Sequence, residues 1–244
     1  MTKVIMCGII LPRLPGVSRL GSLNGCPDFF MEDYITKPRT HIYIDGFNLY
    51  YGLVKDTSHK WLDFEKYFSM LRPHDDILKI LYFTALIDGP HRQNQDDYVR
   101  ALKTCPRIEI ILGKFMKKTV KCRVPLCNYH GLREFKTAEE KGTDVNIAVR
   151  MLDDAYNDRC DKHILVSGDS DLAPVLKLVR KLFPGKKLIT YIPAKASAGN
   201  ARYSRTLRDV SHKLRYLPEN LLPKAQLPNI MQDSDGMFHK PSSW

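Results

Sequence analysis

Aspartates follow two apolar segments of strand length. A carboxylate at the end of a buried strand does not by itself stabilise the fold. Residues 41–44 run into Asp45, and Asn48 follows at the opening of a predicted helix. Residues 164–166 are followed by a short turn that carries Asp169 and Asp171. Burying a carboxylate costs free energy unless a cation or hydrogen-bond donors compensate. The pattern therefore indicates a site that uses these carboxylates.

A third acidic motif, Glu-Glu-Lys-Gly-Thr-Asp-Val-Asn, occupies residues 139–146. We expect Thr143 to be an N-cap, which puts Asp144 in the first helical turn, where a carboxylate stabilises a helix by ~0.3–1 kcal/mol. Taken alone, this motif predicts only a helix start. A cap also explains part of the second motif, since Ser170 or Asp171 can begin the helix that follows. One cap leaves the other carboxylate at that strand end unexplained.

Taken together, the three motifs predict a metal site. If both strands are central in a parallel sheet, Asp45, Asp169 and Asp171 converge on one sheet edge, and Asp144 closes the group from a helix N-terminus. Clustered carboxylates repel one another unless hard cations lie among them, and all-oxygen ligation suits Mg²⁺ or Mn²⁺. Such ions deprotonate a water and stabilise a phosphodiester under attack. The sequence contains no Walker loop, dinucleotide fingerprint or Gly-x-Ser-x-Gly elbow.

The elements around these motifs predict an α/β fold with a mostly parallel sheet, because strand-length apolar runs alternate with stretches of helical period. Several runs are apolar throughout, as expected when helices cover both faces of the sheet. Strands are predicted at residues 41–44, 80–86, 108–112, 163–166 and 188–192. Three helical stripes are predicted to be core: Trp61, Phe64, Phe68 and Leu71; Val145, Ala148, Val149, Leu152 and Ala155; Leu172, Val175, Leu176, Val179 and Leu182.

The three acidic motifs, in this order, resemble the NYN domain, a family of the PIN-like nucleases. They read Asp-Gly-Phe-Asn-Leu-Tyr at residues 45–50, Glu-Lys-Gly-Thr-Asp-Val-Asn-Ile-Ala at 140–148 and Ser-Gly-Asp-Ser-Asp-Leu-Ala-Pro-Val at 167–175. The resemblance covers about residues 41–217 and implies a Rossmann-like (PIN-like) sheet with metal-dependent ribonuclease activity. It places the acidic ligands and their supporting polar groups on Asp45, Asp144, Asp169, Asp171, Asn48 and Ser167.

The chain divides by composition into three regions. Residues 1–38 are expected to be an irregular N-terminal extension, within which Met31 is an alternative start. Residues 39–217 would form the NYN/PIN-like nuclease domain. Residues 218–244 are expected to be a loosely ordered tail, because Pro218, Pro223 and Pro228 interrupt a stretch with few apolar residues. No apolar run approaches the ~20 residues of a membrane-spanning helix, and we expect a cytoplasmic protein.

Basic residues favour nucleic acid as the partner. The 244 residues include 38 Lys and Arg against 27 Asp and Glu, a net charge of +11. Such a surplus of positive charge attracts polyanions. Because the basic residues accompany an acidic metal site, we interpret them as a rim that binds RNA phosphates; the alternative is a charged face that only contacts solvent. The oligomeric state is not evident from the sequence. Candidate RNA-binding residues are Lys114, Lys117, Lys118, Lys121, Arg123, Arg202 and Arg205.

Cys122, Cys127 and His130 are a candidate structural zinc site, because three soft ligands lie within nine residues. The spacing between the two cysteines is wide for such a site, and unligated buried thiols are the alternative.

The favoured function is a Mg²⁺- or Mn²⁺-dependent ribonuclease, endonucleolytic on single-stranded or structured RNA. The expected metal ligands are Asp45, Asp144, Asp169 and Asp171, and Asn48 would orient a carboxylate or the phosphate. A non-catalytic RNA-binding or regulatory module of the same fold is the alternative. A metal-dependent phosphatase or DNA nuclease also fits the residues.

Overall fold

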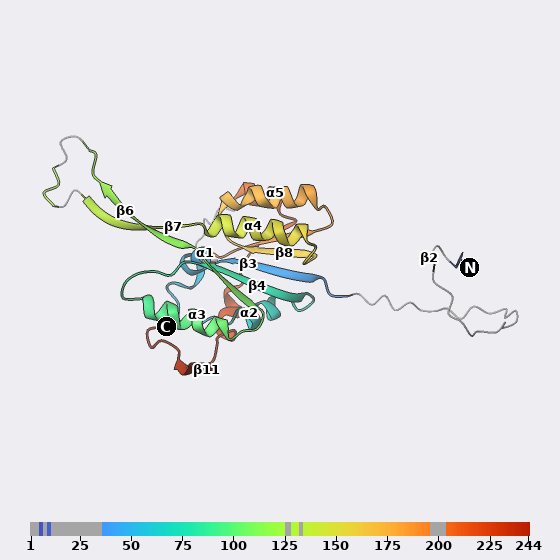
Figure 1. The fold of residues 1–244 in the computed structure, drawn as a ribbon, viewed down its shortest axis with the longest axis horizontal. Helices are drawn as coiled ribbons and strands as arrows, with labels where there is room; N and C mark the ends of the chain where they lie inside the picture. Colours follow the sequence, from blue (N-terminus) through green and yellow to red (C-terminus); the bar gives the residue numbers. More distant parts are fainter. Residues whose placement is uncertain (1–4, 7–8, 11–35, 125–127, 132–133, 196–203) are drawn as a thin grey trace. The chain divides into compact units, whose positions relative to one another are not determined.

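Six strands form the central sheet, and every neighbouring pair is parallel (Figure 1). The strand order is that of a doubly wound fold. The first three strands of the sheet run from its centre to one edge, and the last three run from the centre to the other edge. This confirms the predicted α/β fold and its Rossmann-like sheet. Across the sheet the strands are β10 (Lys213–Tyr216), β9 (Lys187–Ile192), β8 (Lys162–Val166), β3 (Arg39–Asp45), β4 (Asp76–Thr84) and β5 (Ile108–Leu112).

The computed structural model describes residues 5–6, 9–10, 36–124, 128–131, 134–195 and 204–244. The chain divides into two units, Met1–Thr36 and Lys37–Trp244. In the first unit, β1 (Ile5–Met6) pairs antiparallel with β2 (Ile9–Ile10). The predicted irregular extension of residues 1–38 therefore lies mostly outside the described residues.

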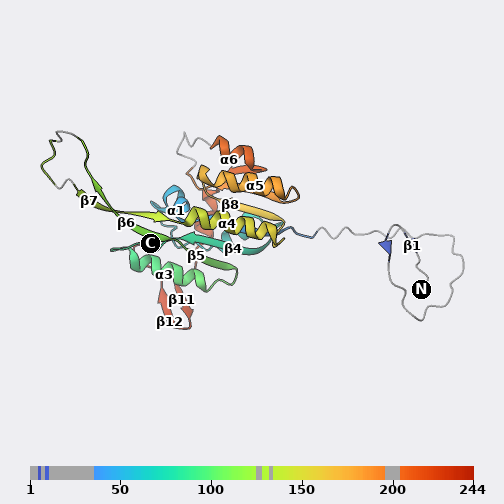
Figure 2. The same cartoon turned by 45° about the horizontal axis from the view of Figure 1, so that its top comes forward.

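Helices cover both faces of the sheet. One face carries α4 (Thr143–Tyr156), α5 (Ala173–Leu182) and α6 (Arg205–Val210); the other carries α1 (Gly46–Leu49), α2 (Phe64–Leu71) and α3 (Arg92–Lys103) (Figures 1 and 2). Alternate strand residues point to opposite faces, so Ile80 and Leu81 lie in two separate hydrophobic cores. No helix among the described residues is long and apolar enough to cross a membrane.

Two of the predicted helical stripes need correction. In α4, Val145 and Val149 are 65% and 62% exposed, whereas Ile147 and Met151 are fully buried. The helix is thus rotated relative to the valine stripe, because its inward face also carries the buried, hydrogen-bonded Asp154. In α5, the stripe is buried except for its last member, Leu182, which is exposed near the end of the helix.

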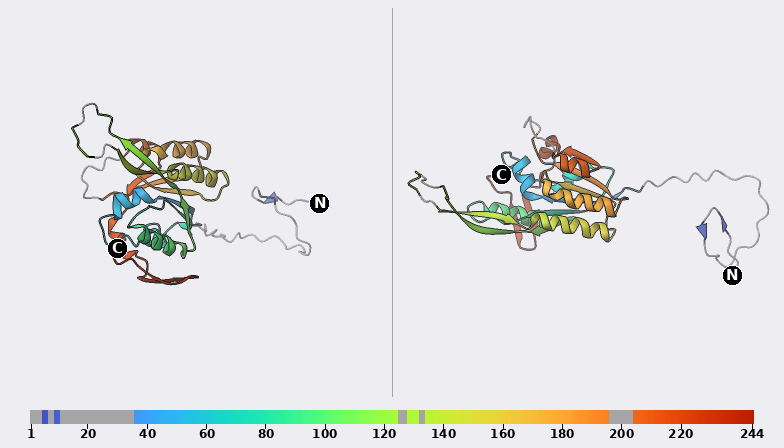
Figure 3. Two further views of the ribbon diagram at one scale, coloured as in Figure 1. Left: turned by 60° about the vertical axis from the view of Figure 1, so that its left-hand side comes forward. Right: turned by 90° about the horizontal axis from the view of Figure 1, so that it is seen from above.

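A two-stranded antiparallel ribbon, which the sequence did not predict, separates β5 from α4. It consists of β6 (Lys114–Lys121) and β7 (Glu134–Lys141), and both strands are mostly exposed. Figure 3 shows this green-to-yellow ribbon projecting from the sheet and its helices in both views. Because β6 begins two residues after β5 ends, the ribbon leaves the sheet at its carboxyl edge.

Residues 218–244 are not the loose tail that their prolines suggested. They form η3 (Glu219–Lys224), a 3₁₀ helix, and a hairpin of β11 (Ile230–Asp233) and β12 (Gly236–His239). Leu222 and Phe238 are buried in the core beneath α2 and α3. Trp61 donates from Nε1 to the Pro228 carbonyl at 2.9 Å, so the prolines shape a packed segment.

Candidate functional site

The topological switch point of the sheet lies between β3 and β8. From β3 the chain runs to β4 and β5 on one side, and β8 on its other side is followed by β9 and β10. Loops that leave the carboxyl ends of two such strands diverge, and ligands bind in the crevice between them. Asp45 ends β3, and Ser167 directly follows β8. The residues predicted at two strand ends therefore meet at the same edge of the sheet.

The Asp45 carboxylate is held by hydrogen bonds from both strand ends. Its Oδ1 accepts from the Asn48 backbone N–H at 2.9 Å, and its Oδ2 accepts from Asn48 Nδ2 at 2.9 Å and Ser167 Oγ at 3.0 Å. The Asn48 side-chain oxygen in turn accepts from the Gly168 N–H at 3.1 Å. Asp45 is only 3% exposed, so these donors offset part of the cost of burying it.

Gly46 lets α1 begin directly at Asp45. A Cβ atom at this position would lie 2.7 Å from the Phe83 carbonyl oxygen of β4, closer than real contacts allow. After α1 the chain continues as a π-helical segment, η1 (Tyr50–Val54). The small residue after Asp45 thus lets the helix pack close to the neighbouring strand.

The second acidic pair sits in the turn after β8. Ser167 Oγ accepts from the Asp169 N–H at 3.0 Å, and Asp169 Oδ1 accepts from the Asp171 N–H at 2.9 Å. Asp169 is therefore the N-cap of the short 3₁₀ helix η2 (Ser170–Leu172), so neither Ser170 nor Asp171 has that position. Asp171 itself is exposed.

Asp144 comes from the first turn of α4, as predicted, but the cap differs. Gly142, with a φ of 93°, is the N-cap, and Thr143 is the first helical residue. Thr143 donates from its backbone N–H at 3.1 Å and from its hydroxyl at 2.5 Å to Glu140 Oε1. Glu140, which the sequence showed only as part of a helix start, is thus a further carboxylate of the site.

The pKa values show that these carboxylates act on one another. Burial, followed by the charges of Asp169, Asp45, Glu140 and Asp171, raises the pKa of Asp144 to about 6. Burial also raises the pKa of Asp45, although the hydrogen bonds from Asn48 and Ser167 oppose the rise. No ion pair between described residues involves any of these five acidic groups.

The donor set fits a hard divalent cation by its chemistry, since it consists of negatively charged oxygens and has no ion-pair partner among the described residues. In the part of the chain that the structure describes, no group of three or more His, Cys, Asp or Glu side chains is placed so that it could hold a metal ion. The carboxylates of the site share an electrostatic environment.

The NYN domain family matches residues 39–209, most of the chain and all of these motifs. The chain belongs to the NYN domain family. This family has a nuclease-type fold, as the resemblance of the motifs implied. The NYN domain begins at β3 and ends within α6, so it includes the whole carboxylate group.

Proteins similar to this NYN protein include the following two. One is 6-hydroxy-3-succinoylpyridine 3-monooxygenase HspA of Pseudomonas putida (strain DSM 28022 / S16), 31% identical over 238 residues, which spans 84% of this chain and 75% of that protein. The other is the crystal structure of a protein of unknown function from Vibrio parahaemolyticus RIMD 2210633. It has 18% identity and a TM-score of 0.49, and the match covers 79% of this chain and 98% of that one.

Most of the basic candidates of the NYN domain are on β6, and Arg205 is on α6. Lys114, Lys117, Lys118 and Lys121 are exposed on β6, and Arg123 is exposed just beyond it. Several of these lysines have acidic partners: Lys117 pairs with Asp88 at 3.2 Å and Lys121 with Glu134 at 2.6 Å. Arg205 begins α6, which contacts η2. Arg202 lies outside the described residues.

The candidate zinc site rests on three residues, of which one, Cys127, lies outside the described part of the chain. Cys122 and His130 are exposed. Zinc binding by the three therefore stays a prediction.

Proposed function

We propose that this NYN protein is a Mg²⁺- or Mn²⁺-dependent endoribonuclease that acts on single-stranded or structured RNA in the cytoplasm. The observation that carries the proposal is the group of carboxylates at the switch point, which repel one another and have no ion-pair partner among the described residues. A protein that only bound phosphates would gain nothing from acidic groups at that position, because like charges repel.

Each side chain of the site has a role in this proposal. Asp45, Asp144, Asp169 and Asp171 would hold the cation. A bound divalent ion lowers the pKa of a water and stabilises the charge of a phosphodiester under attack. Asn48 and Ser167 are positioning residues, because they hold the Asp45 carboxylate from two strand ends. Asn48 donates to Asp45 and accepts from Gly168, which keeps the two loops at a fixed separation.

The basic residues are proposed to guide the RNA strand. Both β6 and α6 follow strands whose carboxyl ends lie at the same edge of the sheet as Asp45, which supports a path for RNA along this edge. Lysine and arginine that neutralise phosphates release counterions, which makes such binding dependent on salt.

The test is a cleavage assay with purified protein and labelled single-stranded RNA, structured RNA and single-stranded DNA, each with Mg²⁺, Mn²⁺ or chelator. The proposal expects RNA fragments only when a divalent ion is present. Binding of RNA without cleavage would instead support a non-catalytic RNA-binding module, and cleavage of DNA alone would support a DNA nuclease.

A second candidate function comes from the relative in Pseudomonas putida, whose name gives it monooxygenase activity on a hydroxylated pyridine. The identity of 31% over most of both chains favours testing the same class of reaction here. Hydroxylation by such an enzyme consumes O₂ and two electrons from a reductant. Incubation with 6-hydroxy-3-succinoylpyridine and NADH, followed by oxygen uptake and product analysis, separates this activity from RNA cleavage. No oxygen uptake above that of heat-denatured protein would remove this candidate.

A further inference from the structure

A cavity of about 460 Å³ lies against α1, on the face of the sheet opposite α4. Its walls come from α1, η1, β4, α3 and residues 243–244. A volume of this size lies within the range of sites for small molecules. Aromatic rings dominate the lining: Phe47, Tyr50, Tyr51, Tyr82, Tyr98 and Trp244.

This cavity is a neighbour of the carboxylate group and not part of it. Gly46 lines the cavity and directly follows Asp45, whereas Asp45, Asp169 and Asp144 do not line it. Tyr82 of β4 lines the cavity beside Gly46, because a Cβ atom at Gly46 would lie 3.0 Å from the Tyr82 ring. The cavity therefore reaches the residue that directly follows Asp45.

Hydrogen bonds to backbone groups occupy two polar side chains of the cavity walls, Tyr98 and Gln95. The Tyr98 hydroxyl donates to the Leu62 carbonyl at 2.7 Å. Gln95 accepts from the Ile87 N–H at 2.8 Å and donates to the Ala85 carbonyl at 2.9 Å. What remains for a ligand deep in the cavity is mainly ring surface, which suits a planar aromatic group.

Two ring pairs line the cavity. Tyr50 and Tyr51 meet edge to face with centroids 5.2 Å apart, and Tyr51 is 62% exposed. Trp244 meets the buried Tyr98 with centroids 5.5 Å apart. A flat ring in the cavity would have aromatic side chains to stack on, as bases do in sites for single-stranded nucleic acid.

The rim of the cavity is basic. Lys55 and Lys60 line it, and no ion pair between described residues involves either lysine. The Lys55 ammonium lies 5.2 Å from the Tyr51 ring centroid. Asp56 is the one acidic lining residue, and His91, the N-cap of α3, also lines the cavity. The two lysines outnumber the carboxylate, which favours a ligand with a negative charge.

We propose that this cavity binds a planar heteroaromatic ring that carries an anionic group, with the ring among the tyrosines and Trp244 and the anion near Lys55 and Lys60. Two sources share this chemistry: a nucleotide of an RNA strand, or a free heteroaromatic acid. The proposal concerns binding and does not depend on RNA cleavage, so the two can fail separately.

The test measures binding without divalent metal, by calorimetry, with tryptophan fluorescence as a second readout. Both tryptophans of the chain report on the site, because Trp244 lines it and the Trp61 ring lies 6.3 Å from that of Trp244. The probes are AMP for the nucleotide source and 6-hydroxynicotinate for the free acid. Adenosine and inorganic phosphate serve as controls that carry only the ring or only the charge.

We expect AMP or 6-hydroxynicotinate to bind more tightly than adenosine or phosphate and to change the tryptophan fluorescence. Preference for AMP assigns the nucleotide source, and preference for 6-hydroxynicotinate assigns the free acid. Tyr51→Ala should weaken binding by about fivefold or more through lost stacking. Lys60→Ala should weaken binding of the anionic probe but not of adenosine.

Matched controls are Tyr156→Ala and Lys103→Ala, which change an exposed tyrosine and an exposed lysine away from the cavity. The proposal is overturned if neither anionic ring compound binds at millimolar concentration, or if the cavity variants behave like these controls. Equal affinities for adenosine and AMP would contradict the role of the lysines.

Discussion

Asp45 accepts hydrogen bonds from Asn48 and Ser167, and these fix its carboxylate without neutralising it. The residue is buried and still has Asp169 and Asp144 in its electrostatic field. Preorganised charge of this kind destabilises the metal-free protein and favours a bound cation. The same group thus has opposite effects on stability with and without metal.

Replacing Asp144 with Asn tests these opposite effects. The change removes one of the repelling charges, so we expect the melting temperature of the metal-free protein to rise by about 2–4 °C, corresponding to ~1 kcal/mol. The stabilisation that Mn²⁺ gives the wild type should be lost, because the ion loses a ligand. Both are measured by thermal unfolding with and without Mn²⁺.

The control for this experiment is Asp76→Asn, which removes an exposed carboxylate at the amino end of β4, at the far edge of the sheet. It should keep the full response to Mn²⁺. An Asp144→Asn variant that is stabilised by Mn²⁺ as strongly as the wild type would show that Asp144 is not a ligand.

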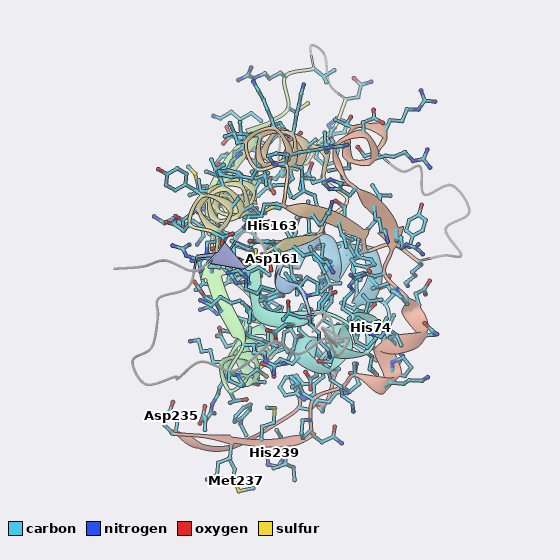
Figure 4. All side chains as sticks on the ribbon, turned by 90° about the vertical axis from the view of Figure 1, so that its right-hand side faces the viewer. His74, Asp161, His163, Asp235, Met237 and His239 are labelled. Carbon is cyan, nitrogen blue, oxygen red and sulfur yellow. The ribbon has the colours of Figure 1, made fainter. Side chains whose placement is uncertain are left out.

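A second group of buried polar side chains lies between α4 and β3. Asp154, which is fully buried, accepts from the Tyr43 hydroxyl at 2.8 Å, and its other partners include His41 at 2.9 Å. The Tyr43 hydroxyl also lies 3.0 Å from His163 Nδ1. Figure 4 shows His163, a residue of β8, near Asp161. Burial of His163 in this network disfavours its charged form.

Acid should therefore unfold the protein partly through His163. Burial, with the charges of His41 and Lys186 adding to it, lowers the pKa of His163 to about 4, from an ordinary value near 6.5. A group with a depressed folded pKa stabilises the fold above its unfolded pKa, and this stability is lost as pH falls from about 6.5 through about 4. Urea unfolding across this pH range measures the loss.

In His163→Gln, the fall in stability between these pH values should be smaller than in the wild type, because Gln does not titrate. His74→Gln changes an exposed histidine and should keep the wild-type pH dependence. Equal slopes for His163→Gln and the wild type would show that another group is responsible.

Sequence reasoning found Asp45 and Asp169 because both follow apolar strands, where a carboxylate is conspicuous. It did not single out Glu140, because a glutamate before a helix start is common and its contact with Thr143 depends on β7, the ribbon strand to which Glu140 belongs. It also missed Asp154. In a helix with an apolar stripe, a lone aspartate is expected to face water, and only the partners on β3 and α4 explain its burial.

At the scale of elements, the strands were predictable and the ribbon was not. Continuous apolar runs in the sequence predicted β3, β4, β8 and β9. In β3, β4 and β9, at least five consecutive residues are buried. The ribbon has no buried face, and charged residues occupy both sides of β6. A two-stranded ribbon with so little core is marginal by itself, and its strands gain stability where they join the sheet and α4.

Replacing Lys117, Lys118 and Lys121 with Ala tests whether the ribbon follows RNA. Their ion pairs are exposed and contribute little to folding, so the melting temperature should be unchanged. Affinity for single-stranded RNA should fall, and the slope of log K against log salt should flatten by up to ~0.7 for each lost phosphate contact.

The control is the triple replacement of Lys66, Lys103 and Lys224, exposed lysines on α2, α3 and η3. It removes the same charge from other elements and should leave more of the salt dependence in place. If both triple variants change the slope equally, the ribbon has no special role in binding.

At the scale of the whole unit, residues 218–244 complete the core on the α2–α3 face. The side chain of Phe238 is 6% exposed, and the Arg100 guanidinium lies 4.3 Å above its ring centroid. Arg100 also pairs with Asp233 at 2.6 Å. A segment rich in proline thus packs tightly, which its composition could not show, because the contacts that hold it come from α2 and α3.

Phe238→Ala should reduce the free energy of unfolding by about 3 kcal/mol, because it removes a buried ring from a packed core. Met237 lies next to it on the outer side of the hairpin, 66% exposed, and points away from the body (Figure 4). Met237→Ala should change stability by about 0.5 kcal/mol or less. Urea unfolding that gave equal losses for the two variants would contradict the packing of this hairpin.

The carboxylates at the switch point are proposed to hold a divalent ion and to cut RNA. The rate at which wild type, Asp169→Asn and Asp76→Asn cleave a labelled single-stranded RNA with Mn²⁺ tests this proposal. We expect cleavage by wild type and Asp76→Asn that chelator abolishes, and at least about a hundredfold loss for Asp169→Asn. Cleavage by Asp169→Asn at the wild-type rate, or cleavage that persists in chelator, would contradict it.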